Sequence, residues 1–565
     1  MGRWCVRGNA AMVAAAVASA WTAPEARAQN FATDRVVIQL APTANPFPAT
    51  TLTPPDDAAA PTFVARGPGG ALLHDLFRIG AVSIEPVFPS PANAALARSI
   101  GLDRFYVIEL APEAEAQNAA AQIAALGGPI TRVEALALGG GLLQDDGDDN
   151  PDDDPDDPDG GTGDGSDNDP TEPAGPTRPN DPGFTFQYGM ENVGQEIPGT
   201  PFRPGGAGQP DADLDVPEAW LLHRATPELI IAIVDSGVSP THVDLAPALL
   251  DGYDFVDDDE DPSDSDIRSH GTHVAGVAAA IADNEIGIAG VAAGASILPV
   301  RVLDAIGAGD VLAGARGITY AADRGAHVIN LSLGYRAESE ALHAAVRYAH
   351  ASGAVLVAAA GNSPGSPVPV PARYMEVIAV SATDHFDRWA SFSTYGPEIS
   401  VSAPGYNIWT TEDTGFNRDG YDDEVGTSMS APMVAGVAGL IREANPSLTP
   451  PQIAAIIEST AQDLGDEGWD ERFGHGRVNA RAALEVALDV APCSKADVST
   501  TGFDVGIPDG VVDVADYLFF LNSWLAQAPA ADIVGRSAAS LPNGVVDHSD
   551  FSAFLQFWVR GCDAP

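Results

Sequence analysis

The stretch "ELIIAIVDSG", residues 228–237, contains an unbroken run of apolar residues that ends at Asp235. Such a run is typical of a strand that is buried on both faces of a sheet. Similar runs recur along the chain with helix-like segments between them: the strands are at residues 296–304, 327–334, 354–362 and 377–384, and the helices at residues 311–325 and 338–353. The alternation predicts an α/β domain over residues 180–490, with helices covering both faces of a parallel sheet. In such sheets the chemistry gathers where the strands end.

Three short segments of this domain carry residues suited to nucleophilic catalysis. Asp235 ends the first strand, His270 opens a helix in "SHGTHVAG", and Ser428 lies in "GTSMSAPMVAG", a small-residue turn that opens another helix. A serine hydroxyl is a weak nucleophile near neutral pH. It needs a histidine to take its proton and a buried carboxylate to orient that imidazole. The three residues are therefore candidates for a nucleophile, its base and an orienting carboxylate, although taken singly Asp235 could be a turn residue and Ser428 a helix cap.

The pair His270 and His273 also raises the question of a zinc site. A zinc-binding helix of this type would carry a glutamate directly after its first histidine, but Gly271 and Thr272 separate the two histidines here. We therefore expect one general base and, one helical turn further on, a buried structural histidine. A variant of His273 should lose stability well before it loses the catalytic groups.

Four segments together resemble the motifs of the subtilisin-like serine proteases, the subtilases. They are "VDSGV" with Asp235, "HGTHVAG" with His270, "AAAGN" with Asn362 and "GTSMSAP" with Ser428, and they occur in the order typical of that family. The resemblance covers residues 180–488. It implies a subtilisin-like fold with a three-layer parallel sheet, and a serine endopeptidase that hydrolyses peptide bonds of proteins and peptides.

The resemblance also implies a role for each matched residue. Asp235 would orient His270, which would act as general base toward Ser428 and then as general acid toward the leaving amine. The side-chain amide of Asn362, with the backbone N–H of Ser428, would form an oxyanion hole. The family's substrate-binding strand corresponds to "NLSLG", in which the residues contacting the substrate backbone would be Ser332, Leu333 and Gly334.

The alternative is a docking or cell-surface protein that keeps the fold but does not need its chemistry. That all four chemical positions are filled favours the enzyme.

The stretch "DNEIGIAGVA", residues 283–292, resembles the loop with which subtilases bind structural calcium. Calcium takes six to eight oxygen ligands, many of them backbone carbonyls on a bent loop. The resemblance implies side-chain ligands from Gln187, Asp244 and Asn284 and carbonyl ligands from Ala282, Ile286 and Ile288. A plain surface loop is the alternative. No organic cofactor is implied.

Residues 1–28 have the pattern of a secretory signal peptide, with two arginines, a short apolar run and a small-residue cleavage site that ends at Ala28. We therefore expect a secreted, extracellular protein without a membrane span.

The chain has 28 basic and 79 acidic residues and a formal charge of −51. This balance argues against nucleic acid and anionic membranes as partners, because both require a positive patch. We expect a monomer.

Residues 29–140 alternate strand-like and helix-like runs, which predicts a small α+β unit. Its position between signal peptide and peptidase resembles that of a subtilase propeptide, which implies a zymogen cut between about Gly139 and Asn180. The alternative is a retained binding domain. Residues 141–179 are expected to form an acidic, disordered linker, because 13 of the 25 residues from 145 to 169 are aspartate and such a segment buries too little apolar surface to fold.

The C-terminal segment, residues 493–562, contains a duplicated unit marked by Trp524 and Trp558. In an exported protein its two cysteines, Cys493 and Cys562, are expected to form one disulfide. The segment resembles a dockerin type I module, a small helical unit with paired calcium loops that would bind a cohesin-like or cell-surface partner. The loops are longer than the family pattern after their first aspartate, and a stapled helical hairpin capping the protease is the alternative. The implied ligands are Asp497, Asp509, Asp513, Asp516, Asp532, Asn543, Asp547 and Asp550.

Overall fold

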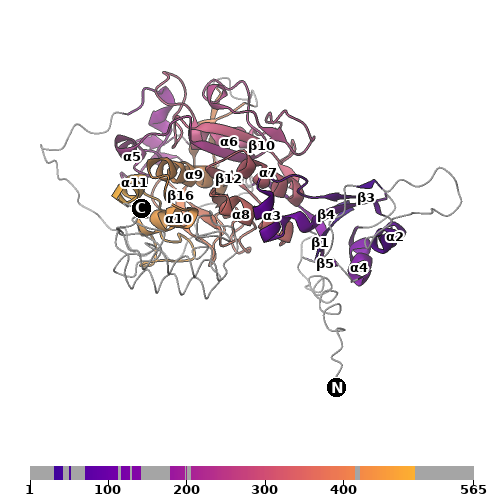
Figure 1. The fold of residues 1–565 in the computed structure, drawn as a ribbon. Coiled ribbons are helices and arrows are strands. Elements are labelled where there is room, and N and C mark those ends of the chain that lie inside the picture. The colour runs from indigo at the N-terminus through magenta and orange to yellow at the C-terminus, as the bar shows by residue number, and fades with distance from the viewer. Residues whose placement is uncertain are drawn as a thin grey trace, which may run out of the picture.

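The computed structural model describes two units that pack against each other, one antiparallel and one parallel (Figure 1). The described residues are 31–41, 50–51, 70–79, 81–111, 116–126, 130–141, 178–197, 199, 205–413 and 420–489. The signal peptide, nearly all of the acidic linker, and the C-terminal segment with its expected disulfide and dockerin-like loops lie outside these residues. Among the helices that are described, none combines the length and apolar character needed to cross a bilayer.

The larger unit is built on a seven-stranded sheet in which every pair of neighbours is parallel. This confirms the α/β architecture expected from the unbroken apolar runs. From one edge to the other the strands are β16 (Val401–Pro404), β15 (Val377–Thr383), β14 (Val355–Ala359), β12 (Val328–Leu331), β8 (Ile230–Asp235), β10 (Ser296–Arg301) and β9 (Tyr253–Asp254).

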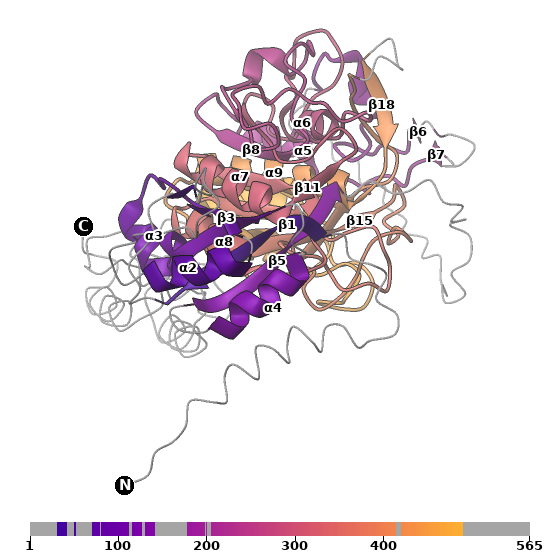
Figure 2. The same cartoon turned by 90° about the vertical axis from the view of Figure 1, so that its right-hand side faces the viewer.

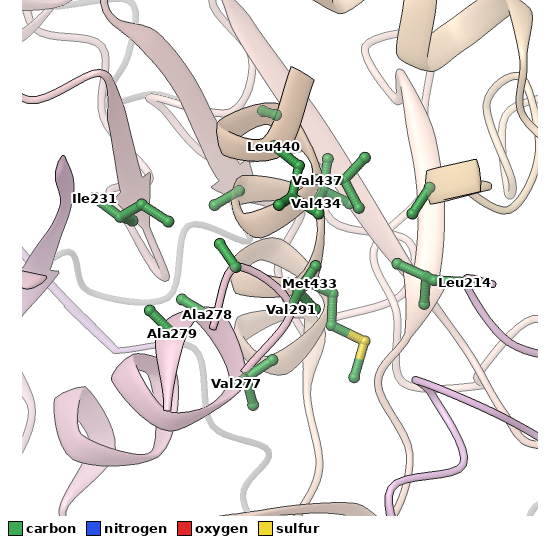
Figure 3. Close-up of a cluster of buried hydrophobic side chains, with 14 of the residues drawn as sticks. Leu214, Ile231, Val277, Ala278, Ala279, Val291, Met433, Val434, Val437 and Leu440 are labelled. Atoms are coloured by element: carbon green, nitrogen blue, oxygen red, sulfur yellow. The ribbon is translucent and has the colours of Figure 1, made fainter. Parts of the chain in front are cut away.

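Helices cover both faces of this sheet, as expected for strands buried on both sides. In β8, Ile231 and Ile233 pack toward one helical layer, while Ala232 and Val234 pack toward the other. The first layer contains α5 (Val216–Leu222), α6 (His270–Ala279), α9 (Thr427–Ala444), α10 (Pro450–Ser459) and α11 (Ala480–Asp489), and the second contains α7 (Val311–Asp323) and α8 (Glu340–Ala351). Figure 3 shows the first core around α9. Side chains from β8 and α6 thereby fix the position of α9.

The N-terminal unit is an antiparallel sheet with two of its helices packed on one face, in agreement with the expected α+β unit. The strand order is β5, β1, β4, β3, β2. Its elements are β1 (Phe31–Leu40), β2 (Thr50–Thr51), α2 (Gly70–Ile79), β3 (Ala81–Pro86), α3 (Ala94–Ile100), β4 (Phe105–Leu110), α4 (Ala116–Leu126) and β5 (Ile130–Gly141). Val36 and Ile38 of β1 pack with α2 and α4, so one face has its own core.

The second face of this small sheet packs on α7 and α8 of the larger unit. Val37, Val107 and Leu136 belong to the same buried cluster as residues of these two helices. Figures 1 and 2 both show the N-terminal unit lying against α7 and α8. The contact buries apolar area on both sides, which is the main stabilising term in such packing.

Short elements complete the described structure. The 3₁₀ turns are η1 (Leu102–Arg104), η2 (Pro182–Phe186) and η3 (Ala246–Ala248), and the short strands are β6 (Glu196–Ile197), β7 (Gly206–Ala207), β11 (Ala308–Asp310), β13 (Leu333–Gly334), β17 (Ile408–Thr411) and β18 (Tyr421–Glu424).

Candidate active site

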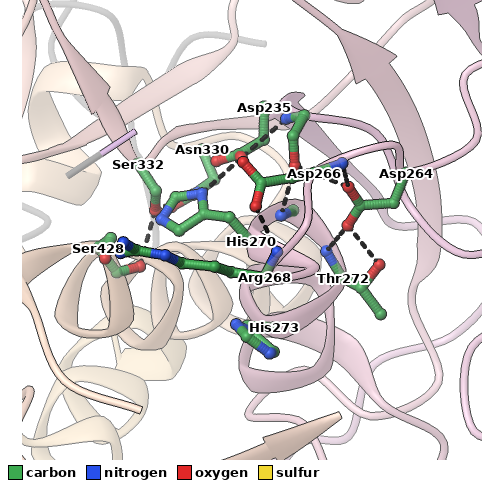
Figure 4. A network of polar contacts seen from close by, with 12 residues as sticks. Asp235, Asp264, Asp266, Arg268, His270, Thr272, His273, Asn330, Ser332 and Ser428 are labelled. Atoms are coloured by element: carbon green, nitrogen blue, oxygen red, sulfur yellow. Dashed lines mark hydrogen bonds and ion pairs between the residues drawn. The ribbon is translucent and has the colours of Figure 1, made fainter. Parts of the chain in front are cut away.

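The structure brings Asp235 and His270 into direct contact. β8 ends at Asp235 and α6 begins at His270, and Nδ1 of His270 lies 2.6 Å from Oδ1 of Asp235 (Figure 4). Both side chains are buried. Oδ1 of Asp235 also accepts a hydrogen bond from the backbone N–H of Ser236 at 2.8 Å. A buried carboxylate bound to Nδ1 keeps the proton on that nitrogen and leaves Nε2 as the basic atom.

A close approach between β8 and α6 explains the glycine of "HGTH". A Cβ atom on Gly271 would lie 2.0 Å from the carbonyl oxygen of Gly237, much closer than any side chain permits. Glycine at this position therefore allows the helix to start directly above the end of the strand. This close packing sets the separation between Asp235 and His270.

Asp264 fastens the same junction, a role that the sequence alone did not indicate. One carboxylate oxygen of Asp264 accepts from the backbone N–H of Thr272 at 2.9 Å and from its hydroxyl at 2.6 Å. The other accepts from the hydroxyl of Ser236 at 2.9 Å, and that hydroxyl accepts from the N–H of Gly271 at 2.9 Å. Burial raises the pKa of Asp264 to about 6. The end of β8 and the first turn of α6 are thus held by one carboxylate.

Ser428 is the second residue of α9 and is fully buried. The turn before it requires Gly426, which has a φ of 144°. The imidazole of His270 lies between Asp235 and Ser428 in Figure 4, and its Nε2 has no hydrogen-bond partner among the described residues. Hydrogen bonds between catalytic groups often tighten only when the substrate binds.

Asn362 lies three residues beyond β14 and its side chain points to the residue before Ser428. Its Oδ1 accepts from both the backbone N–H and the hydroxyl of Thr427, each at 2.9 Å. The Thr427 hydroxyl in turn accepts from the N–H of Gly361 at 3.0 Å. The acceptor end of the Asn362 amide is therefore fixed on Thr427, and its donor end faces away from it. The sequence motif contains Thr427 but did not reveal this orienting role.

The electrostatic surroundings of His270 favour its protonated form. Burial alone would lower the pKa of His270, but the charge of Asp235 and the hydrogen bond to it, with smaller contributions from Asp266 and Asp264, raise the pKa above its ordinary value of 6.5. The imidazolium ion that forms when a serine is deprotonated would be stabilised in the same way.

This shift predicts a pH dependence for any reaction in which His270 is the general base. A general base must be neutral, so we expect the acidic limb of the kcat/KM profile to lie above pH 6.5, the ordinary histidine value. Asp266→Asn removes one of the charges that raise the pKa of His270 and should move this limb to lower pH. A pH profile with a peptide substrate measures both. A limb that stays in place in the variant would contradict the assignment of His270 as the base.

His273 is buried one turn further along α6. Burial, together with the charge on His270, lowers its pKa to about 3, so the ring is neutral under ordinary conditions. Oε1 of Glu424 lies 3.9 Å from Nδ1 of His273. Within the described part of the chain no group of three or more histidine, cysteine, aspartate or glutamate side chains is arranged to hold a metal ion.

The end of β5 lies between two strands of the larger unit, β11 and β13. Gly141 and Gly140 lie opposite Leu333 and Gly334 of β13, in antiparallel register. On the other side Gly140, Gly139 and Leu138 lie opposite the three residues of β11. The N-terminal unit thus adds a strand beside β13, which contains two of the three residues that the sequence analysis expected to bind substrate. The side chain of Ser332 points elsewhere, since its hydroxyl donates to the carbonyl oxygen of Ser428 at 2.8 Å.

The expected calcium loop is only partly assembled around its predicted ligands. Asp244 is buried, and its carboxylate accepts from the side chain of Asn284 at 2.7 Å, the N–H of Ile288 at 2.9 Å and the hydroxyl of Tyr421 at 2.7 Å. Gln187 pairs instead with the main chain of Ala289 through both ends of its amide, at 2.7 and 2.9 Å.

The carboxylate of Asp181, which the sequence analysis did not include among the ligands, also contacts this loop. Asp181 accepts from the N–H groups of Asp283 at 2.8 Å and Asn284 at 3.2 Å. Burial, and more weakly the nearby charges of Asp244 and Asp283, raise the pKa of Asp181. Carboxylate oxygens suit a hard cation, although Asp283 is already paired with Arg224 at 2.6 Å. Ala282 and Ile286 flank these contacts on the same loop.

Comparison with known proteins agrees with this geometry. The model of the subtilase family matches residues 226–476. Thermitase of Thermoactinomyces vulgaris is 46% identical over 272 residues, which are 48% of this chain and 94% of thermitase. Subtilisin Savinase of Lederbergia lenta is 42% identical over 253 residues, or 45% of this chain and 89% of that protein.

Among solved structures, fervidolysin from Fervidobacterium pennivorans, a keratinolytic enzyme related to subtilisin, has a TM-score of 0.57 at 26% identity. The match covers 82% of this chain and 62% of fervidolysin. Together with the contact of Asp235 and His270 and the parallel sheet, these matches lead to one conclusion: the chain belongs to the subtilase family and is a serine endopeptidase.

Proposed function

We propose that the enzyme cleaves peptide bonds through an acyl-enzyme on Ser428. Oγ of Ser428 attacks the carbonyl carbon and its proton passes to Nε2 of His270. The same proton then goes to the leaving amine, and a water molecule activated by His270 releases the acyl group. The observation that carries this proposal is the 2.6 Å contact of the buried pair Asp235 and His270 on the side of the imidazole away from Ser428.

The oxyanion would be bound by Nδ2 of Asn362 and the backbone N–H of Ser428. The two hydrogen bonds from Thr427 to Oδ1 of Asn362 support this role, because they turn the amide so that its donor end faces away from Thr427. A donor that is already oriented before charge develops costs little reorganisation during the reaction.

We infer that the chain is made as a zymogen and that the N-terminal unit blocks its own cleft. The pairing of β5 with both β11 and β13 supports this, since an antiparallel strand in this position excludes a substrate strand. In this antiparallel register Gly140 lies opposite Gly334 and Gly141 lies opposite Leu333, so the pairing advances toward Ser332, which contacts Ser428. We therefore expect the cleavable bond on the C-terminal side of Gly141.

Apolar burial and strand pairing hold this unit in place more strongly than charge. Arg35 lies 3.0 Å from Asp310, and Arg132 lies 2.5 Å from Glu340. All four side chains are partly exposed to solvent, and such ion pairs contribute about 0–1 kcal/mol each. The two ion pairs join arginines of the N-terminal unit to acidic side chains of the peptidase, and they therefore favour one orientation of the N-terminal unit on the peptidase.

Export and calcium binding complete the proposal. The signal-like segment 1–28 supports secretion. Asp181, Asp244 and Asn284 would contribute oxygen ligands to a structural calcium ion, with carbonyl groups of the 283–292 loop supplying others. The ion would rigidify the loop and take no part in the chemical steps.

A fluorophosphonate probe, which reacts with activated serines, tests the proposed nucleophile. We expect labelling of the mature enzyme and complete loss of labelling in Ser428→Ala. The matched control is Ser430→Ala, because Ser430 is also buried in α9 but its hydroxyl bonds to the carbonyl of Pro404 at 3.2 Å. Labelling that persists in Ser428→Ala would rule out this serine.

A further inference from the structure

The carbonyl group of Ser428 cannot make the hydrogen bond that its position in α9 would normally give it. In an α-helix the carbonyl of one residue accepts from the N–H four residues later. Four residues after Ser428 comes Pro432, which lies inside α9 and has no N–H. The helix therefore supplies no donor to this carbonyl through the usual bond, at the residue that carries the nucleophile.

Ser332 supplies a donor instead. Its hydroxyl donates to the carbonyl oxygen of Ser428 at 2.8 Å, and Nδ2 of Asn330 donates to the same hydroxyl at 3.0 Å (Figure 4). All three residues are fully buried. Because the hydroxyl accepts from Asn330, its own hydrogen is directed toward Ser428. The chain of two hydrogen bonds runs from the sheet to the backbone of the nucleophile.

The location of these donors connects the nucleophile to the strand that holds the substrate. Asn330 belongs to β12, and Ser332 is the residue between β12 and β13. β13 is the strand against which β5 lies. A shift of β13 on binding a peptide would therefore be transmitted to the backbone of Ser428 through one hydroxyl group. An ordinary helical bond from residue 432 would not make this connection.

We propose that Asn330 and Ser332 are positioning residues that hold the backbone of Ser428 in register with the bound substrate strand. Neither side chain takes part in proton transfer. Their effect is on the geometry of attack, which tolerates little displacement because misplacement of about 1 Å costs roughly a hundredfold in rate. The inference rests on the proposed role of Ser428 as nucleophile.

The first test is Ser332→Ala, measured with a peptide substrate and expressed per active site titrated. We expect kcat to fall about tenfold, the factor that corresponds to losing one buried hydrogen bond, with KM changed less than twofold. The matched control is Ser381→Ala in β15. It removes a buried hydroxyl that donates to the carbonyl of Arg472 at 2.6 Å. It should leave kcat per titrated site unchanged.

The second test restores the missing helical donor. Pro432→Ala introduces an N–H four residues after Ser428, so the double variant Ser332→Ala, Pro432→Ala should recover most of the lost kcat. A role in folding alone would reduce the titrated fraction and the melting temperature without changing kcat per site, and this result would overturn the proposal. A double variant as slow as Ser332→Ala would also overturn it.

Asn330→Ala provides an alternative test if Ser332→Ala does not fold. It keeps the hydroxyl but removes the donor that orients it, so we expect a smaller fall in kcat, about threefold. An unchanged kcat would overturn the positioning role. The proposed nucleophile is tested separately: if Ser428→Ala is inactive while Ser332→Ala and Asn330→Ala are both fully active per site, the inference fails and the assignment of Ser428 stands. Activity in Ser428→Ala would refute that assignment itself.

Discussion

A full-length chain carrying Ser428→Ala is expected to accumulate uncut, with its N-terminal unit still attached. Removal of the nucleophile from a triad of this type slows catalysis about 10⁶-fold, so self-cleavage would be undetectable over the time of expression. The unmodified chain should instead yield a shorter form whose new N-terminus lies beyond Gly141. Mass spectrometry and N-terminal sequencing of purified protein measure both results.

The control for this experiment is Ser430→Ala, which should be processed like the unmodified chain. Expression in a host without extracellular proteases separates self-cleavage from cutting by other enzymes. A shortened Ser428→Ala chain in that host would contradict autocatalytic maturation. A new N-terminus at or before Gly141 would contradict the register of β5 between β11 and β13.

The second large effect is expected for Asn362→Leu. The variant loses the proposed side-chain donor to the oxyanion while keeping a side chain of similar size, so kcat should fall about 10²- to 10³-fold with little change in KM. Thr427→Val is the companion variant, because it removes one of the two hydrogen bonds that orient the Asn362 amide. Its kcat should fall less, by about tenfold or below. Steady-state kinetics with a chromogenic peptide measure both.

An increase in KM with unchanged kcat in Asn362→Leu would mean that the amide binds substrate and transition state equally, and it would contradict the oxyanion role. In the double variant, losses that multiply would show instead that Thr427 acts independently of Asn362.

The fold of the larger unit could be predicted because its strands are apolar on both faces. Residues such as Ala232 and Val234 alternate with Ile231 and Ile233, and no polar side chain interrupts the run before Asp235. The N-terminal unit carried the same signal in "DRVVIQLA". Val36 and Ile38 face its own helices. The apolar residue between them, Val37, faces the peptidase. The sequence pattern therefore required a second covering layer, but it did not say what supplies it.

The groups around the site were harder to predict because their partners are far away in sequence. Asp181 binds a loop more than 100 residues later, and Asp264 joins a strand to a helix through Ser236 and Thr272. Neither residue stands out in the local sequence, where aspartates are common. Position in the family motif assigned Gln187 to the calcium loop, whereas its amide is paired with Ala289. Such choices depend on side-chain direction, which periodicity does not contain.

β5, the strand that we propose blocks the cleft, ends in three consecutive glycines, Gly139, Gly140 and Gly141. Glycine has no side chain, so this part of β5 engages β11 and β13 through its backbone alone. The N-terminal unit is also held by apolar contacts between one face of its sheet and the helices α7 and α8, outside the cleft. Mutations that remodel the neighbouring subsites could therefore change which peptides the protease prefers without loosening its own inhibitor. Selectivity and latency would be free to evolve separately in this chain.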